Sequence, residues 1–319
     1  MATTLALAGD TMLGRGVAER LRSVPPEALF APDVVAAAAE ADLFVLNLEC
    51  CISDWGQPWP DPGKPFFFRA PPVAVEALVH LGVDCVTLAN NHALDYGPGA
   101  LEDTLAFLSG AGIAHAGAGR DETEARTPAV LSSGGFRLGV VGLSDHPADF
   151  AAGPGRPGIA YADLHRGLPA WLVAALEEVE ADAVLVTPHW GPNMTAEPVP
   201  HVRAAARALL GTRATLIAGH SAHVFHGVGE RVLFDLGDFL DDYAVDPVLR
   251  NDLGLLFLVT LDQGGPVRLE AVPLRLEYCF TRVADGEDAA WIRDRFRAAC
   301  RAMGTEVGER DGRLVVDWR

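Results

Sequence analysis

The sequence contains little positive charge. Its 25 lysine and arginine residues face 43 aspartate and glutamate residues, which gives a formal net charge of −18 at pH 7. A chain this acidic is not expected to bind a nucleic-acid backbone or an anionic membrane surface. Negative charge also attracts cations, although we expect most of these carboxylates to be solvated on the surface.

Cysteine is scarce, and the sequence shows no segment that would direct the chain to a membrane. The five cysteines are scattered and form no C-x-x-C spacing, which favours reduced thiols in a cytosol over a disulfide framework. The N-terminus enters an apolar strand almost at once, without a basic leader, a long apolar segment or a cleavage site. We therefore expect a cytoplasmic protein with no export signal or membrane anchor.

What the sequence does contain is a regular alternation of short apolar strands and helices. The 319 residues are 50% hydrophobic, enough for one large core. The clearest expected strands cover residues 3–8, 43–48, 83–89, 183–187, 215–218 and 232–235, the last running on into residues 236–239. No repeat or linker is visible, so we predict a single α/β domain over residues 1–319, in which the strands and helix of residues 255–319 complete the fold.

The stretch LANNHALDYG, at residues 88–97, places polar side chains directly after a buried strand. Open α/β sheets carry their chemistry at such strand ends. The amide oxygen of Asn91 can ligate a metal, His92 can move a proton, and Asp95 can orient that histidine. Taken alone, the stretch is equally compatible with an asparagine-rich turn whose histidine only satisfies backbone groups.

The ends of the other apolar strands carry the same kinds of side chain. Carboxylate, amide and imidazole groups are ligands for hard and borderline divalent metals. The set, in chain order, is Asp10, Asn47, Glu49, Asn91, His92, His189, His220 and His223. These are more ligands than one metal needs, and two metals bridged by a carboxylate would use them.

Several motifs, in order, resemble the CapA family of poly-γ-glutamate capsule synthesis proteins, which is related to calcineurin-like metallophosphatases. The motifs are GDTMLGR, NLE, FFFRAPP, LANNHALDYG, PHWG, GHSAHVFHGV and FDLGDF, which together run from about residue 3 to about residue 243. The resemblance implies a four-layer α/β/β/α sandwich with a dinuclear metal site. It also implies the ligands Asp10, Glu49, Asn91, His189, His220 and His223, with Glu49 as the bridge. His92 then falls at the position of the acid/base histidine, and Asp95 at that of its partner.

Two departures from the family pattern concern the same site. The family often has GHHPH where this chain reads GHSAH at residues 219–223, so that one histidine is absent. It often has LGNF where this chain has LGDF, so that Asp238 adds a carboxylate. Asp238 is predicted to be a further ligand or a second proton-transfer group.

Other residues near these motifs are candidates for contact with a substrate. Residues 53–72 form a long loop rich in proline and aromatic residues, which we call the aromatic loop. We expect Arg15 to clamp a substrate carboxylate or phosphate, Arg69 of the aromatic loop to do the same, and Trp190 to line a pocket. His146 and His226 are left open, and Asp241 and Asp242 are expected to be solvated. The remaining histidines, expected at the surface or in packing, are His80, His115, His165 and His201.

These observations favour a metal-dependent enzyme. The favoured chemistry is Cα epimerisation of a C-terminal residue in a ribosomal peptide, with a base such as His92 and an acid such as Asp238 on opposite faces. The alternatives are a hydrolase of phosphoester or amide bonds and a capsule biosynthesis protein. The cofactors would be two divalent ions, Mn, Zn, Fe, Mg or Ca, and the partner a peptide or small molecule that carries a carboxylate or phosphate.

Overall fold

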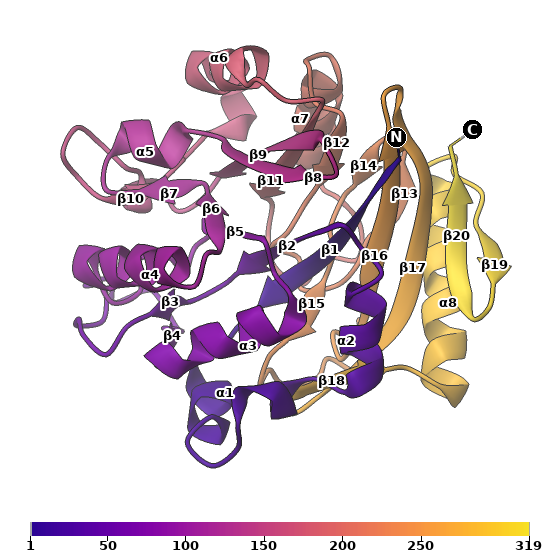
Figure 1. Ribbon diagram of the computed structural model, residues 1–319, viewed down its shortest axis with the longest axis horizontal. Helices are drawn as coiled ribbons and strands as arrows, with labels where there is room; N and C mark the ends of the chain where they lie inside the picture. The colour runs from indigo at the N-terminus through magenta and orange to yellow at the C-terminus, as the bar shows by residue number, and fades with distance from the viewer. Residues whose placement is uncertain (1, 319) are drawn as a thin grey trace.

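Two β-sheets that pack face to face form the centre of the computed structural model, which describes residues 2–318 (Figure 1). The first sheet has ten strands: β1 (Thr3–Thr11), β2 (Leu43–Leu48), β5 (Cys85–Thr87), β6 (Ala114–Ala116), β15 (Asp238–Leu240), β16 (Leu253–Asp262), β17 (Gly265–Glu277), β18 (Phe280–Val283), β19 (Gly308–Arg310) and β20 (Arg313–Asp317). The second has six: β8 (Ala129–Ser133), β9 (Phe136–Ser144), β11 (Ala183–His189), β12 (Leu216–Ala218), β13 (Val228–Gly229) and β14 (Val232–Leu233).

Strand β1 lies in the middle of the first sheet and is bordered on both sides. The main strand order is β19-β20-β17-β16-β1-β2-β5-β6. Strands β1, β2, β5 and β6 are parallel, whereas β16 runs antiparallel to β1. The near-continuous burial of β1 and β2 is typical of strands covered on both faces.

Alternate side chains of the central strands supply two separate cores. Leu5 and Leu7 of β1 point into the core between the sheets, where they join Leu138 and Leu185 of the second sheet. The intervening β1 side chains, such as Ala8, face the opposite way into a core with the helices. Because each sheet buries both faces, the chain forms the predicted four-layer α/β/β/α sandwich.

Helices cover the outer face of each sheet. Side chains of three helices, α2 (Pro32–Ala38), α3 (Val75–Leu81) and α4 (Pro98–Gly110), contribute to the core outside the first sheet. Two helices, α6 (Ala170–Glu178) and α7 (Pro200–Leu210), do so outside the second. At one end of the sandwich α8 (Gly286–Ala302) contributes to the core between the sheets, and α1 (Arg15–Arg20) follows β1 directly (Figure 1).

The C-terminal part of the chain extends the first sheet beyond β1. Strand β16 pairs with β1, β17 pairs with β16, and β20 pairs with β17, each time antiparallel. Among residues 2–318, no helix is both long enough and apolar enough to cross a bilayer. The five cysteines are buried and free.

The segment after β14 differs from the expected strand. The expected strand over residues 232–235 ends at Leu233 in the structure, and the chain then crosses to the other sheet. Gly237 makes this crossing with a φ of 74°, and β15 begins at Asp238 beside β1. This left-handed backbone conformation favours glycine, which explains why the chain has a glycine at this point of the crossing.

Smaller elements that the sequence did not indicate complete the fold. Helix α5 (Glu122–Arg126) is capped by Asp121, whose side chain accepts hydrogen bonds from the backbone amides of Thr123 and Glu124. The sequence signal for this helix is the capping residue Asp121 followed by acidic residues, but the helix itself is only five residues long. Two pairs of two-residue strands also form, namely β3 (Cys51–Ile52) with β4 (Arg69–Ala70), and β7 (Ala118–Gly119) with β10 (Gly158–Ile159).

The contact between β1 and the crossing generates a test of the fold. A Cβ atom on Gly9 would lie 1.8 Å from the carbonyl oxygen of Gly237, which also accepts a hydrogen bond from the Asp10 amide. We expect Gly9→Ala to lower the free energy of unfolding by about 2–4 kcal/mol, because the clash is with backbone that cannot move alone. Denaturant unfolding measures the change.

The matched control for this substitution is Gly99→Ala. Gly99 lies in the first turn of α4, with no atom within 4 Å of an added Cβ. This change should leave stability unchanged or raise it by up to about 1 kcal/mol. Equal unfolding free energies for the two variants would contradict the tight approach of β1 to the crossing.

Candidate metal centre

The polar residues that follow the parallel strands meet at one edge of the sandwich. Asp10 pairs in register with Asn47 of β2 and with Asp238 of β15. On the second sheet, an isolated β-bridge joins His189 to His220. The carboxyl ends of parallel strands are where α/β proteins place ligands, and here the ends of strands from both sheets converge.

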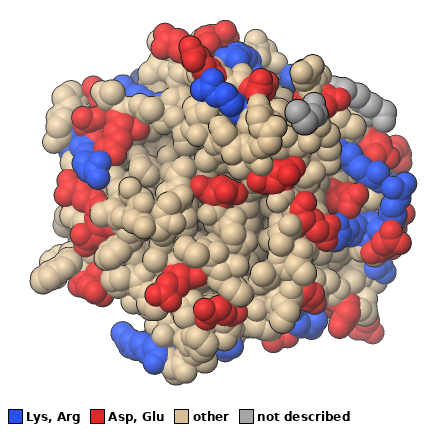
Figure 2. All heavy atoms as spheres, viewed as in Figure 1, with Lys and Arg blue, Asp and Glu red and all other residues tan. Residues whose placement is uncertain are grey.

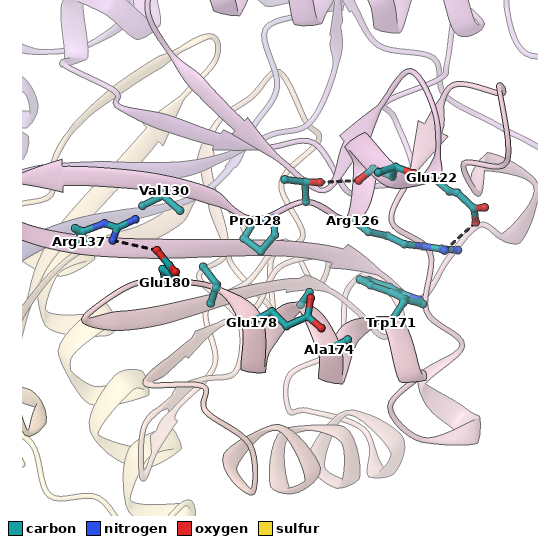
Figure 3. A pocket seen from close by; sticks show the side chains of 13 residues that line it. Glu122, Arg126, Pro128, Val130, Arg137, Trp171, Ala174, Glu178 and Glu180 are labelled. Atoms are coloured by element: carbon teal, nitrogen blue, oxygen red, sulfur yellow. Dashed lines mark hydrogen bonds and ion pairs between the residues drawn. The ribbon is translucent and has the colours of Figure 1, made fainter.

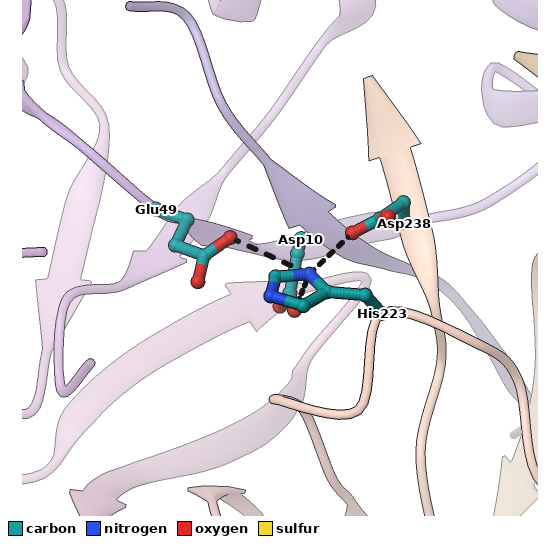
Figure 4. A group of neighbouring side chains, drawn as sticks. All are labelled: Asp10, Glu49, His223 and Asp238. Atoms are coloured by element: carbon teal, nitrogen blue, oxygen red, sulfur yellow. Dashed lines mark hydrogen bonds and ion pairs between the residues drawn. The ribbon is translucent and has the colours of Figure 1, made fainter. Parts of the chain in front are cut away.

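Four of these side chains form a compact buried cluster (Figure 4). Asp10, Glu49, His223 and Asp238 each offer one ligand atom, and these atoms all lie within 4.8 Å of one another. The imidazole Nδ1 of His223 lies 2.8 Å from Asp238 Oδ1, 3.4 Å from Asp10 Oδ2 and 3.9 Å from Glu49 Oε2. Three carboxyl groups therefore surround one imidazole, away from bulk water.

Other atoms of the ligand type are buried at the same edge without a hydrogen-bond partner among residues 2–318. These atoms are Oε1 of Glu49, Oδ1 of Asn91 and both ring nitrogens of His189. An unsatisfied buried polar group costs about 1–3 kcal/mol. Oxygen and imidazole donors left open in this way fit divalent cations, which would satisfy them together.

Burial and mutual repulsion shape the electrostatics of the cluster. The pKa of Glu49 is raised well above its usual value by burial and by the charge of Asp10. The pKa of Asp238 is raised by burial and by Asp241. Burial also acts on Asp10, but the nearby imidazoles of His220, His189 and His223 outweigh it and lower the pKa of that carboxyl. The site therefore holds more acid than its imidazoles can neutralise.

A chain of amides holds Asp10 in place. The side-chain amide of Asn47 donates to Asp10 Oδ1 at 2.7 Å, and that of Asn90 donates to Asn47 Oδ1 at 3.0 Å. All three side chains are buried. Asn47 and Asn90 thus serve as a second layer that orients a candidate ligand.

Beside the cluster, His92 forms a pair with Asp95. His92 Nδ1 lies 2.6 Å from Asp95 Oδ2, and the His92 ring stacks on Phe68 with 3.9 Å between centroids. Burial lowers the pKa of His92 to about 4, although Asp95 acts in the opposite direction. The ring is therefore neutral near pH 7, and a proton on Nδ1 shared with Asp95 leaves Nε2 as the acceptor.

Lys64, for which the sequence predicted no role, joins the aromatic loop to this pair. Its Nζ lies 3.0 Å from Asp95 Oδ1 and donates to the Asn91 carbonyl oxygen at 2.6 Å. The Phe68 amide donates to the other oxygen of Asp95 at 2.6 Å. Its signal in the sequence was its rarity, because Lys64 is the only lysine in the chain.

The three predicted substrate contacts have different surroundings. Arg15 is partly exposed and pairs with Asp242 at 3.2 Å. Arg69 donates to the Trp55 carbonyl oxygen and lies 4.2 Å from the centre of the Tyr96 ring. Trp190 is only 2% exposed and its indole donates to the Phe234 carbonyl oxygen, so it packs within the fold and offers no surface to a substrate.

The prediction that Asp241 and Asp242 are solvated was wrong. Both are buried; Asp242 accepts a hydrogen bond from the Gly16 amide as well as pairing with Arg15. Of the two histidines left open, His226 donates to the Thr195 carbonyl oxygen, and the His146 ring lies 5.2 Å from that of His189.

The comparisons with known proteins agree with the sequence motifs. Residues 4–243 match the family described as "Bacterial capsule synthesis protein PGA_cap". A probable polyglutamine synthesis accessory protein of Mycobacterium tuberculosis is 31% identical over 98% of this chain and 95% of its own length. The capsule biosynthesis protein CapA of Bacillus anthracis is 26% identical over 86% of this chain and 67% of its own.

Among solved structures, a putative 5′-nucleotidase from Staphylococcus aureus is similar, with a TM-score of 0.45 and 14% identity over 92% of this chain and 58% of that chain. The family match covers most of the chain, and the mycobacterial relative aligns with nearly all of it. The chain therefore belongs to the bacterial capsule synthesis family, the CapA-type family that its motifs resemble.

Proposed function

We propose that this chain is a metal-dependent hydrolase that cleaves amide bonds in a carboxylate-bearing polymer of the poly-γ-glutamate type. The observation that carries the proposal is the buried cluster of three carboxyl groups and an imidazole, surrounded by ligand atoms without partners. The relatives named for polyglutamine and capsule synthesis support this class of polymer. They favour it over the peptide epimerase expected from the sequence.

The residues that would hold two divalent ions are the predicted ligands Asp10, Glu49, Asn91, His189, His220 and His223, with Asp238 as an addition. Glu49 suits the bridging role, because its Oε2 faces His223 while its Oε1 has no hydrogen-bond partner in residues 2–318. Bound there, divalent ions would polarise the carbonyl group and make a water molecule acidic near neutral pH.

The remaining residues of the site would handle the proton and the substrate. Nε2 of His92 is placed to accept a proton and return it to the leaving amine, while Asp95 holds the proton on Nδ1. Lys64 and the Phe68 amide fix Asp95 in this orientation. Arg15, together with Arg69 of the aromatic loop, would bind carboxylates of the polymer.

Epimerisation at Cα remains a second candidate because of one observation. The raised pKa of Asp238 favours a protonated acid in the same site as the neutral base His92. Removal of the Cα proton by one group and its replacement by the other would invert the carbon.

Incubation with a γ-linked glutamate oligomer and Mn²⁺ in heavy water separates the two reactions. We expect shorter oligomers without deuterium at Cα, as detected by mass spectrometry. Glu49→Gln should reduce cleavage by at least about 100-fold, because it removes a shared ligand. The matched control is Glu102→Gln, an exposed position on α4 that should retain full activity. Intact oligomers that gain deuterium would instead establish epimerisation.

The electrostatics of the cluster predict a pH-dependent stability in the absence of metal. The raised pKa of Glu49 means that the folded state holds this proton more tightly than the unfolded state, whose pKa is about 4.3. This contribution is present at low pH and falls as pH rises above about 4.3, by at most about 1.4 kcal/mol per pH unit. Chelated wild-type protein should therefore lose stability between pH 5 and 7 more steeply than Glu49→Gln.

Denaturant unfolding at several pH values, with EDTA or with Mn²⁺, measures this difference. Mn²⁺ should stabilise the wild type increasingly as pH rises, because it replaces the proton, and should have much less effect on Glu49→Gln. Parallel profiles of unfolding free energy against pH for the two proteins in EDTA would show that the pKa of Glu49 is not raised in the folded state.

A further inference from the structure

A polar cavity lies next to the candidate metal centre. Its volume is about 270 Å³, and it opens between α1, residues 53–54, β4 and Tyr96. Three arginines line it: Arg15, Arg22 and Arg69. The acidic residues in its wall are Glu19 and Asp54. Within residues 2–318 neither of them pairs with an arginine of the wall, and only Arg15 has an acidic partner, Asp242. Figure 2 shows acidic side chains (red) spread over the viewed face of the molecule.

The larger cavity near α5 and α6 differs in this respect (Figure 3). Its volume is about 520 Å³, and its two arginines are matched by acids of its own wall. Arg126 lies 2.8 Å from Glu122, and Arg137 lies 3.9 Å from Glu180. With its charges matched in this way, that cavity has no evident selectivity for an anion.

In the smaller cavity, two of the arginines are held in position by the protein. Nη1 of Arg69 donates to the Trp55 carbonyl oxygen at 2.9 Å, and its guanidinium stacks on Tyr96. Arg15 pairs with buried Asp242 and has a backbone φ of 47°. A non-glycine residue in this left-handed region costs about 1–2 kcal/mol, and such strain collects at functional sites.

The third arginine is available to a ligand. Arg22 is exposed just beyond α1, and within residues 2–318 its guanidinium has no hydrogen bond or ion pair. A guanidinium presents a planar fork of donors that matches both oxygens of a carboxylate. Arg22 therefore adds a guanidinium group without a partner in residues 2–318, next to two arginines whose positions are fixed.

The cavity is close to the metal centre. The Arg15 guanidinium lies 5.6 Å from the centre of the Phe68 ring, and Phe68 stacks directly on His92. The Arg15 guanidinium also lies 5.9 Å from the centre of the Tyr243 ring, whose hydroxyl donates to Glu49 Oε2 at 3.3 Å. A single layer of aromatic rings thus separates Arg15 from both the candidate base and the candidate bridging ligand.

We propose that Arg15, Arg22 and Arg69 form a subsite for a carboxylate of the polymer, one unit away from the bond at the metal centre. This inference rests on the proposed function for the identity of the ligand. A polymer with a carboxylate on every unit would occupy both places at once, so that the arginines fix its register. The subsite would then select a chain of acidic units over a single amide.

Calorimetric titration with a five-unit γ-linked glutamate oligomer tests the subsite without turnover. The protein carries His92→Gln and Mn²⁺, so that the oligomer is not consumed. Adding Arg22→Gln should weaken binding about tenfold or more, because one charge-assisted pair is lost. The matched control, Arg301→Gln, removes an exposed arginine at the end of α8 and should leave affinity unchanged.

Two further ligands distinguish the sources of negative charge. An oligomer whose free carboxylates are amidated should bind more weakly and should not respond to Arg22→Gln. Inorganic phosphate should compete poorly; if it displaces the oligomer as well as free glutamate does, the cavity is a phosphate site. Equal affinities of the Arg22→Gln and Arg301→Gln proteins for the acidic oligomer would also overturn the subsite.

The outcomes separate this inference from the proposed hydrolase. Binding that depends on Arg22, with no cleavage by the wild type, would retain the subsite and reject the hydrolase. Cleavage of the oligomer at the same rate and KM by wild type and Arg22→Gln would retain the hydrolase and reject the subsite. No binding of the oligomer to any of the proteins would overturn the subsite outright.

Discussion

The burial of three carboxyl groups against one another is the constraint on which the rest of the site depends. Asp10, Glu49 and Asp238 converge on His223 with almost no exposure to solvent. Two unit charges about 4 Å apart interact with about 4 kcal/mol at an effective dielectric constant of about 20. Three such pairs can be buried together only if protons or cations offset the repulsion. The ligand atoms without hydrogen-bond partners around the cluster indicate cations.

The architecture supplies the precision that such a cluster needs. Asp10 stands on the central strand of the first sheet, with Asp238 in register on β15. The close approach of Gly9 to the Gly237 carbonyl group makes this pairing possible, since a side chain on Gly9 would clash with that backbone. The second sheet brings the histidines from the opposite side, so the site is built only when the two sheets pack.

A loop far from these strands is tied into the same site. Lys64 and Phe68 of the aromatic loop both bind Asp95, and Phe68 covers the His92 ring. One buried carboxylate therefore connects the loop to the candidate base. Phe68 and its neighbour Tyr243, which packs against the His223 ring, also lie against the Arg15 guanidinium, so the carboxylate subsite and the candidate metal centre share a wall.

The sequence predicted the fold class and the convergence of strand-end residues, because apolar periodicity and polar strand ends are local signals. It did not reveal that residues after Leu233 leave one sheet for the other, since a crossing depends on tertiary pairing. Lys64 and Asp242 were missed for the same reason: their partners lie far away along the chain. Trp190 follows a candidate ligand in sequence, but its indole turns inward to a backbone carbonyl.

The most direct measurement is anomalous X-ray diffraction from crystals grown with Mn²⁺. The account predicts anomalous peaks in contact with Asp10, Glu49 and His223, with the open atoms of Asn91 and His189 completing the coordination. Well-ordered crystals in which these side chains surround no peak, or in which the Mn²⁺ binds elsewhere, would contradict it.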